Sequence, residues 1–219
     1  MKIKFTISSH INSYEKTYPL LAQSLLESGV PAEDIYFFIG GFYEYAKIEN
    51  ENGINVYQVN HNSIDLTGLI SVVDLELHSD YWFLLHDTCK VGKQFYSKIK
   101  EFNYQSDTVA LNDIRCASMN IGAYKMEYLY KIKQQLFQFK NQNYSADNMK
   151  LFKQLGIKYE SIFLDKTYYY NYSLWTNNGI EDVYDTGVLR QVEVYPDIDL
   201  IKYKANYNVQ DINNVELKL

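Results

Sequence analysis

The stretch YWFLLHDTCKVG, residues 81–92, decides how the rest of the chain is interpreted. Five apolar or aromatic residues, Tyr81 to Leu85, run without a polar interruption. Such a run is typical of a strand in a parallel sheet, because helices cover both faces of that sheet. A histidine, a carboxylate, a hydroxyl and a thiol then follow before the chain reaches Gly92. The sequence therefore predicts a buried strand that ends in a short polar loop.

Further apolar runs alternate with helical patterns along the first half of the chain. We expect strands at residues 2–8, 35–39, 55–59 and 108–111, and helices at residues 14–28, 65–78 and 93–102. Pro19 lies inside the first helical pattern, so we expect the regular helix to begin near that proline. Because strands and helices alternate, the predicted fold class is α/β, with a mainly parallel central sheet flanked by helices.

The pattern changes after residue 115. Residues 122–139 predict a mostly helical segment, and residues 148–155 predict a further amphipathic helix. From Ile157 onward, runs such as VLRQVEVY and DLIKYKANY are typical of strands or extended connections. The second half is therefore expected to add strands and helices around the first.

No Pro-rich or Ser/Gly-rich tract marks a linker between two domains. A chain of 219 residues is long enough to bury one sizeable core. We therefore predict a single domain over residues 1–219, with a doubly wound half in residues 1–115 and an added half in residues 116–219.

Composition narrows the classes of partner. The net charge is −6 and the chain holds two arginines, Arg115 and Arg190, so no nucleic-acid partner is expected. No apolar run approaches the roughly 20 residues that span a bilayer, and MKIKFTISSH lacks the apolar segment of a signal peptide. Two cysteines, Cys89 and Cys116, are too few for a disulfide scaffold. These features predict a cytoplasmic protein with reduced thiols and no membrane span.

Ligands of an open parallel sheet bind where its strands end at their carboxyl edge. In this chain that rule selects Ser8 to His10, Gly40-Gly41 and His86-Asp87. The phosphate loops GxGxxG and GxxxxGK[ST] do not occur in the sequence. Their absence argues against a dinucleotide dehydrogenase and a P-loop NTPase.

A nucleotide diphosphate bound without such a loop needs another group to neutralise its charge. A divalent metal held by a carboxylate at a strand end supplies that group. Asp87 fits this role, and His86 could add a nitrogen ligand or bond the pyrophosphate. In the alternative interpretation, Asp87 caps a turn or helix and His86 only satisfies backbone groups.

The strands KFTISSH, IYFFIGG and WFLLHDT, with a helix after each of the first two, resemble the nucleotide-sugar half of a GT-A type glycosyltransferase. In that family a DxD motif ends the fourth strand, and its last carboxylate holds the metal, here expected to be Mn²⁺ or Mg²⁺. The resemblance implies the register Leu85-His86-Asp87, which keeps the last carboxylate, or Asp87-Thr88-Cys89, which keeps only the first. Either register is a degenerate DxD motif.

The segment SMNIGAY, residues 118–124, is similar to the glycine-containing segment that lines the donor sugar and acceptor in this superfamily. The resemblance implies that Asn120 and Gly122 position the sugar. It also implies that Asp147, at an expected helix start, takes the acceptor hydroxyl proton, although an N-cap role for Ser145 or Asp147 is the alternative. The family's late metal-binding histidine has no match, because all four histidines lie at or before position 86.

The resemblance thus implies a GT-A-like glycosyltransferase that moves a hexose or pentose from a nucleotide-diphosphate sugar, first a UDP-sugar, to a glycan or other hydroxyl acceptor. The rival hypothesis is a non-catalytic α/β module that binds a nucleotide or a glycan. A third is a Cys–His hydrolase centred on Cys89. The residues assigned by the first hypothesis are Ser8, Ser9, His10, His86, Asn120 and Gly122 for the donor, Asp87 for the metal and Asp147 for catalysis.

Overall fold

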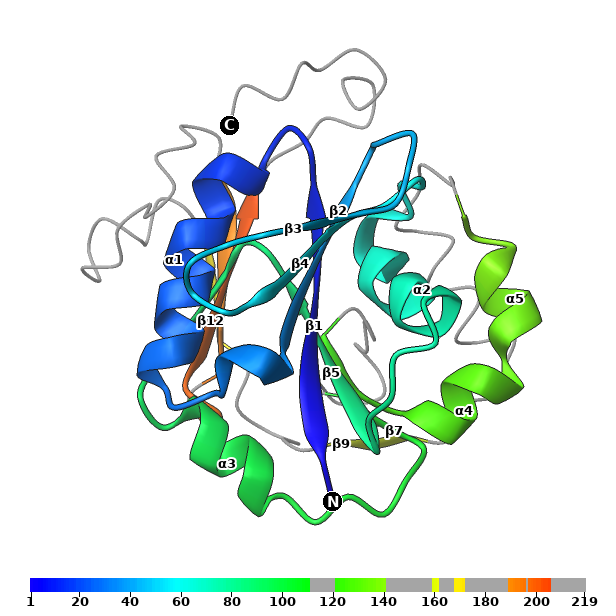
Figure 1. Cartoon of the computed structure of the whole chain (residues 1–219). Coiled ribbons are helices and arrows are strands. Elements are labelled where there is room, and N and C mark those ends of the chain that lie inside the picture. The colour runs from blue at the N-terminus through cyan, green and yellow to red at the C-terminus, as the bar shows by residue number, and fades with distance from the viewer. Residues whose placement is uncertain (111–120, 141–158, 162–167, 172–188, 196, 206–219) are drawn as a thin grey trace.

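The computed structural model describes residues 1–110, 121–140, 159–161, 168–171, 189–195 and 197–205. These residues form a large mixed sheet with helices on both of its faces and a smaller antiparallel sheet (Figure 1). Among the helices of the described segments, none has the length and hydropathy needed to cross a bilayer.

The large sheet has the predicted α/β architecture. Its strands are β1 (Ile3–His10), β2 (Ile35–Gly40), β3 (Ala46–Ile48), β4 (Asn55–Gln58), β5 (Tyr81–His86), β7 (Thr108–Ala110), β8 (Gly122–Lys125) and β9 (Tyr159–Ser161). They lie in the order β3-β4-β2-β1-β5-β8-β7-β9. The central strands β4, β2, β1 and β5 pair in parallel, whereas β8 is antiparallel to β5. The prediction of a mainly parallel central sheet is confirmed.

Helices lie on both faces of this sheet. They are α1 (Tyr14–Glu27), α2 (Thr67–Asp74), α3 (Phe95–Glu101), α4 (Met126–Lys131) and α5 (Lys133–Phe137), with 3₁₀ turns η1 (Ala32–Asp34) and η2 (Ile64–Leu66). Figure 1 shows α1 and α3 on one side and α2, α4 and α5 on the other. The second sheet has the order β10-β11-β12-β6 and contains β10 (Tyr168–Asn171), β11 (Leu189–Tyr195), β12 (Leu200–Ala205) and β6 (Cys89–Val91). The predicted extra C-terminal strands are therefore present.

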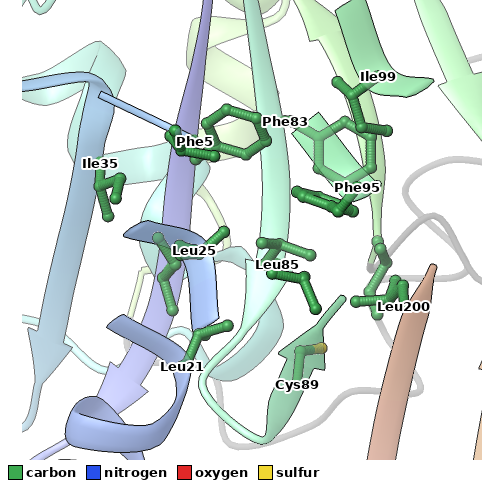
Figure 2. Packing of buried hydrophobic residues seen from close by; sticks show 14 of the residues in the cluster. Phe5, Leu21, Leu25, Ile35, Phe83, Leu85, Cys89, Phe95, Ile99 and Leu200 are labelled. Carbon is green, nitrogen blue, oxygen red and sulfur yellow. The ribbon is translucent and has the colours of Figure 1, made fainter. Parts of the chain in front are cut away.

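The apolar run from Tyr81 to Leu85 in β5 is buried on both faces of the sheet. Successive side chains of a strand point to opposite faces. Phe83 and Leu85 of β5 pack in the layer that contains α1 and α3, whereas Trp82 and Leu84 pack in the layer that contains α2. Figure 2 shows the first of these layers around Phe83 and Leu85. A central strand with a helix layer on each side has no polar face, which explains the unbroken run.

Helix α1 begins earlier than its sequence indicates. It starts at Tyr14, so the prediction that it begins near Pro19 is wrong. The backbone N–H of Thr17 donates to the Ser13 carbonyl at 3.1 Å. The hydroxyls of Ser13 and Thr17 also donate to Asp87, which follows β5. These hydrogen bonds to Asp87 stabilise the helical turn before Pro19. The local sequence pattern contains no sign of them.

Two other helix predictions differ from the structure. Residues 122–125 form strand β8 rather than helix, because they fill the position between β5 and β7 in the sheet. Ala123 and Tyr124 accordingly pack on opposite faces of that sheet. The helix expected at residues 65–78 is shorter in the structure. The 3₁₀ turn η2 precedes it, and the helix itself, α2, ends at Asp74. The helix expected at residues 148–155 lies outside the described residues.

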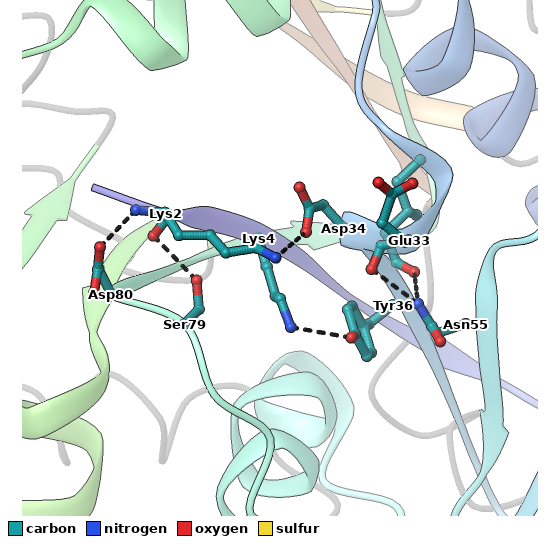
Figure 3. Close-up of polar contacts among 9 residues, drawn as sticks. Lys2, Lys4, Glu33, Asp34, Tyr36, Asn55, Ser79 and Asp80 are labelled. Carbon is teal, nitrogen blue, oxygen red and sulfur yellow. Dashed lines mark hydrogen bonds and ion pairs between the residues drawn. The ribbon is translucent and has the colours of Figure 1, made fainter.

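Polar groups at the amino edge of the sheet bond to one another (Figure 3). The backbone N–H of Lys2 donates to Asp80 at 2.5 Å, and the Lys2 ammonium lies 3.2 Å from a carboxylate oxygen of Asp34. The Lys4 ammonium donates to the hydroxyl of Tyr36 at 3.1 Å. These contacts join the starts of β1, β2 and β5, and they account for the charged residues at this edge.

The small sheet holds the loop that follows β5. Strand β6 pairs antiparallel with β12. Beyond β6, the N–H of Gly92 donates to the Asp199 carbonyl at 2.7 Å, and the N–H of Gln94 donates to the Asp199 carboxylate at 3.0 Å. A Cβ atom on Gly92 would lie 2.1 to 2.2 Å from that carboxylate. The packing of Asp199 therefore requires a glycine at position 92.

We predict that Gly92→Ala lowers the free energy of unfolding by about 1–3 kcal/mol, because the added methyl group overpacks this contact. Asp199→Ala alone should also destabilise the protein, because the N–H of Gln94 loses its acceptor. In the Asp199→Ala background, however, Gly92→Ala should cost much less. Urea denaturation of the four proteins in this cycle measures the coupling. Equal costs of Gly92→Ala in both backgrounds would show that the carboxylate is not what excludes the methyl group.

Candidate functional site

The candidate site lies where the sheet order reverses direction. From β1 the chain continues to β2 and β4 on one side, and β5 lies on the other side of β1. Ser8 of β1 pairs with His86 of β5 at the carboxyl end of both strands. In open α/β sheets, ligands bind outside the carboxyl ends of the strands at such a switch point. The structure therefore brings the polar ends of β1 and β5 together at the position that this rule selects.

The alternation of strand side chains divides these polar groups between the two faces of the sheet. Ser9 and Asp87 lie on the face of α1, where Ser9 Oγ donates to Asp87 Oδ2 at 2.7 Å. Ser8 and His86 lie on the face of η2 and α2, where both contact Asp65. His86 and Asp87 are neighbours in sequence, but they have separate partners.

Asp87 is the centre of a buried group of hydroxyls. Its Oδ2 accepts hydrogen bonds from Ser9, from Ser13 at 2.9 Å and from Thr17 at 2.9 Å. Burial raises the pKa of the Asp87 carboxyl, and the three hydroxyl donors and the nearby His10 oppose that shift. One side chain thus ties the end of β5 to the end of β1 and to the first turn of α1.

The geometry around Asp87 does not provide a ready-made metal site. A cation at Oδ2 would have to displace hydroxyl donors that already occupy this atom. Among the described residues, no group of three or more His, Cys, Asp or Glu side chains is arranged to hold a metal. The metal role of Asp87 and the requirement for Mn²⁺ or Mg²⁺ stay predictions of the resemblance.

On the other face of the sheet, Asp65 contacts the carboxyl ends of both β1 and β5. His86 Nε2 lies 3.3 Å from Asp65 Oδ1, and both side chains are 14% exposed. Ser8 Oγ donates to the Asp65 carbonyl at 2.9 Å and accepts a bond from the N–H of Gly68 at 2.9 Å. Asp65 was not selected from the sequence, because it lies in η2 rather than directly after a strand. An acidic residue in a first helical turn is a common feature and gave no stronger signal.

His10 lies against the double glycine that ends β2. Its Nδ1 accepts a hydrogen bond from the N–H of Asn12 at 3.2 Å, and burial lowers the pKa of its imidazole. Gly41 has a φ of +98°, and a Cβ atom there would lie 2.9 Å from His10 Nε2. The N–H of Gly41 donates to the carbonyl of His61 at 3.2 Å. The two glycines therefore allow the loops after β1, β2 and β4 to approach one another.

The structure describes only some of the remaining predicted residues. Gly122 is the first residue of β8 and pairs with Leu84, so it lies beside the end of β5. Asn120 and Asp147 lie outside the described residues. Cys89 is fully buried in the apolar layer under α1, which gives the Cys–His hydrolase hypothesis no support.

A buried histidine that the sequence did not single out lies behind the site. His61 Nδ1 lies 3.1 Å from Ser63 Oγ, and Nε2 lies 3.2 Å from Ser71 Oγ. The pKa of His61 is lowered to about 4, mainly by burial and also by the nearby Lys140 ammonium, while Asp74 opposes the shift. His61 is therefore neutral near pH 7, and it fixes the connection between β4 and α2 that carries Asp65.

Comparisons with known proteins agree with this architecture. No protein-family model matches the chain, and no curated protein matches its sequence. The crystal structure of the glycosyltransferase GlyE from Streptococcus pneumoniae TIGR4 superposes with a TM-score of 0.50 at 12% identity, over 74% of this chain and 46% of the GlyE chain. The chain has a glycosyltransferase-like fold. It spans less than half the length of GlyE, and at this identity the likeness concerns the fold alone.

Two further structures give lower scores. The apo form of GlyE superposes with a TM-score of 0.47 at 14% identity, over 74% of this chain and 45% of that chain. A protein from Aquifex aeolicus VF5 superposes with a TM-score of 0.47 at 11% identity, over 74% of this chain and 86% of that one.

We predict that the free energy of unfolding of Asp87→Asn rises relative to that of wild type as the pH rises above 3.8, the usual pKa of the carboxyl. Because burial raises the folded-state pKa, folding favours the protonated form. That stabilisation is complete below pH 3.8 and is lost as the pH rises through the folded-state pKa. Asparagine does not titrate, so its variant lacks this loss. Urea denaturation of both proteins over this range measures the difference, and a wild type that gains stability relative to the variant would show a lowered pKa instead.

His61→Gln should change stability in a different pH range. The folded-state pKa is about 4 and the usual value is 6.5, so folding favours the neutral imidazole. Wild type should therefore lose stability as the pH falls from 6.5 towards 4, and the glutamine variant should lose less. Thermal unfolding at several pH values compares the two. A difference between them that does not vary with pH would contradict a lowered pKa at His61.

Proposed function

We propose that the chain is a glycosyltransferase that moves a sugar from a nucleotide-diphosphate sugar, with a UDP-sugar as the first candidate, to a hydroxyl of a glycan or another acceptor. The observation that carries the proposal is the pairing of Ser8 with His86 at the switch point of a glycosyltransferase-like sheet. The likeness of the fold to that of GlyE supports the same assignment.

In this proposal the donor lies across the carboxyl ends of β1, β2 and β5. Ser8, Ser9 and His10 line the nucleotide, and His86 lies beside the diphosphate. Gly122, with no side chain, allows the sugar ring to approach the start of β8. Asn120 is also predicted to contact the sugar.

The transfer breaks the bond between the anomeric carbon and the oxygen of the β-phosphate. The acceptor oxygen forms the new bond to that carbon, and the nucleoside diphosphate leaves with the bonding electron pair. The acceptor proton goes to a base, for which Asp147 is the predicted residue. Asp87 positions the ends of β1, β5 and α1 around the donor. A dependence on Mn²⁺ or Mg²⁺ is a separate prediction, and no step here depends on a metal.

A screen of nucleotide-diphosphate sugars by thermal shift, with and without Mn²⁺ or Mg²⁺, tests this proposal. A ligand that binds only the folded state raises the unfolding temperature by mass action. We expect one or more nucleotide sugars to raise it, and slow donor hydrolysis to follow when no acceptor is present. A protein that binds donors but never hydrolyses them would be the non-catalytic module instead. A metal-dependent shift in wild type that Asp87→Ala abolishes would support the metal role of Asp87.

The variant His86→Ala locates the donor site. It should weaken donor binding about tenfold or more, and the unfolding temperature without ligand measures separately the stability lost with the contact to Asp65. His78→Ala is the matched control, because His78 is exposed and precedes β5 at the opposite edge of the sheet. Equal donor affinity of the two histidine variants would place the donor elsewhere.

A further inference from the structure

Asp65 places a carboxylate at the edge of the sheet where the diphosphate of the donor is proposed to lie. Its Oδ1 lies 3.3 Å from His86 Nε2, and each of the two side chains is largely buried. Two negatively charged groups side by side repel one another, so a carboxylate is a poor direct contact for a diphosphate. The position of Asp65 at this edge is therefore better explained by its contact with His86.

The backbone of Asp65 is tied to the end of β1. Ser8 Oγ donates to the Asp65 carbonyl at 2.9 Å, and it accepts a bond from the N–H of Gly68 at 2.9 Å. Ser8 is buried, and a Cβ atom on Gly68 would lie 3.2 Å from its hydroxyl oxygen. The turn η2 cannot shift against β1 without losing these contacts. The carboxylate of Asp65 is therefore carried by a backbone whose position is fixed by the sheet.

His86 is held both by its backbone and by its side chain. Its backbone belongs to β5 and pairs with Ser8 of β1. Its Nε2 atom is shielded from solvent and faces Asp65, although 14% of the side chain is exposed. The part of the imidazole that solvent reaches is therefore not the nitrogen that faces Asp65. A ligand that contacts His86 would meet that other part of the ring.

We propose that Asp65 is a positioning residue for donor binding, which rests on the function proposed above. Its carboxylate holds the imidazole of His86 in one orientation, so that the exposed part of the ring is in place before the diphosphate binds. A side chain that a ligand must immobilise lowers the affinity, and a side chain that is fixed in advance avoids this cost. Contacts of this kind depend on supporting residues that do not themselves touch the ligand.

The test is a double-mutant cycle of Asp65→Ala and His86→Ala. UDP, GDP, ADP, CDP and dTDP are the probes, and the one that binds wild type most tightly is titrated by calorimetry. Asp65→Ala should weaken its binding about threefold to tenfold, because the ligand must then immobilise His86 itself. In the His86→Ala background, Asp65→Ala should weaken binding no further. A loss by the same factor in both backgrounds would show that Asp65 only maintains the shape of the edge, and would overturn the inference.

Two further variants make the result specific. Asp65→Asn keeps the packing and an oxygen that can face Nε2, so its loss of affinity should be smaller than that of Asp65→Ala and should also depend on His86. If the asparagine variant loses affinity equally with and without His86, the inference is wrong even where the alanine variant does not fold.

Asp80→Ala is the matched control. Asp80 precedes β5 at the opposite edge of the sheet, and it accepts a hydrogen bond from the backbone N–H of Lys2 in front of β1. Its removal costs a contact between the same two strands, but nucleotide affinity should not change. Equal losses of affinity in Asp80→Ala and Asp65→Ala would attribute both to a general loosening of the sheet. Thermal unfolding without ligand measures the stability of each variant separately.

The outcomes separate this inference from the function on which it rests. Equal nucleotide affinity in wild type and Asp65→Ala would overturn the role of Asp65 and leave the glycosyltransferase proposal intact. A loss of affinity that depends on His86, in a protein that hydrolyses no nucleotide sugar, would keep the role of Asp65 and overturn the proposed function. Wild type that binds none of the nucleoside diphosphates would overturn both.

Discussion

The carboxylate of Asp87 is the interaction on which the geometry of the candidate site depends. Three hydroxyls, from Ser9, Ser13 and Thr17, donate to one of its oxygens. They come from β1, from the residue before α1 and from the first turn of that helix. A buried carboxylate with this many donors is costly to rearrange, because it would lose the hydroxyl hydrogen bonds that compensate its burial. The ends of β1 and β5 are therefore fixed relative to each other before any ligand binds.

The two polar residues that follow the apolar run of β5 therefore have different partners. From the sequence, His86 and Asp87 were expected to act together on a diphosphate or metal. In the structure the alternation of β5 sends His86 towards Asp65 and Asp87 towards α1. His86 thus contacts Asp65 beside the edge where a donor is proposed to bind, and Asp87 holds the strands of that edge together. Preorganised sites depend on such supporting contacts as much as on the groups that touch the ligand.

Much of the central sheet could be predicted from the sequence, because unbroken apolar runs report strands that are covered on both faces. The carboxyl-edge rule likewise predicts that Ser8, Ser9, His10 and His86 end neighbouring strands at one edge of the sheet, as they do, and their roles in donor binding stay predictions. Three features had no such local signal. The start of α1 before Pro19 depends on hydrogen bonds to Asp87, and β8 is a strand because of its place between β5 and β7. Asp65 contacts the ends of β1 and β5 only through the packing of η2.

The pairing of β6 with β12 also has a consequence for how the site forms. Cys89 and Lys202 are more than a hundred positions apart, yet they are directly opposed in the small sheet. Closing so long a loop costs entropy that only the completed pairing repays, and contacts of this range form slowly. During synthesis the parallel strands β1, β2, β4 and β5 can associate while β12 is still being made. The loop after β5 would then gain its final partner last, so the core of the sheet precedes the finished site in time.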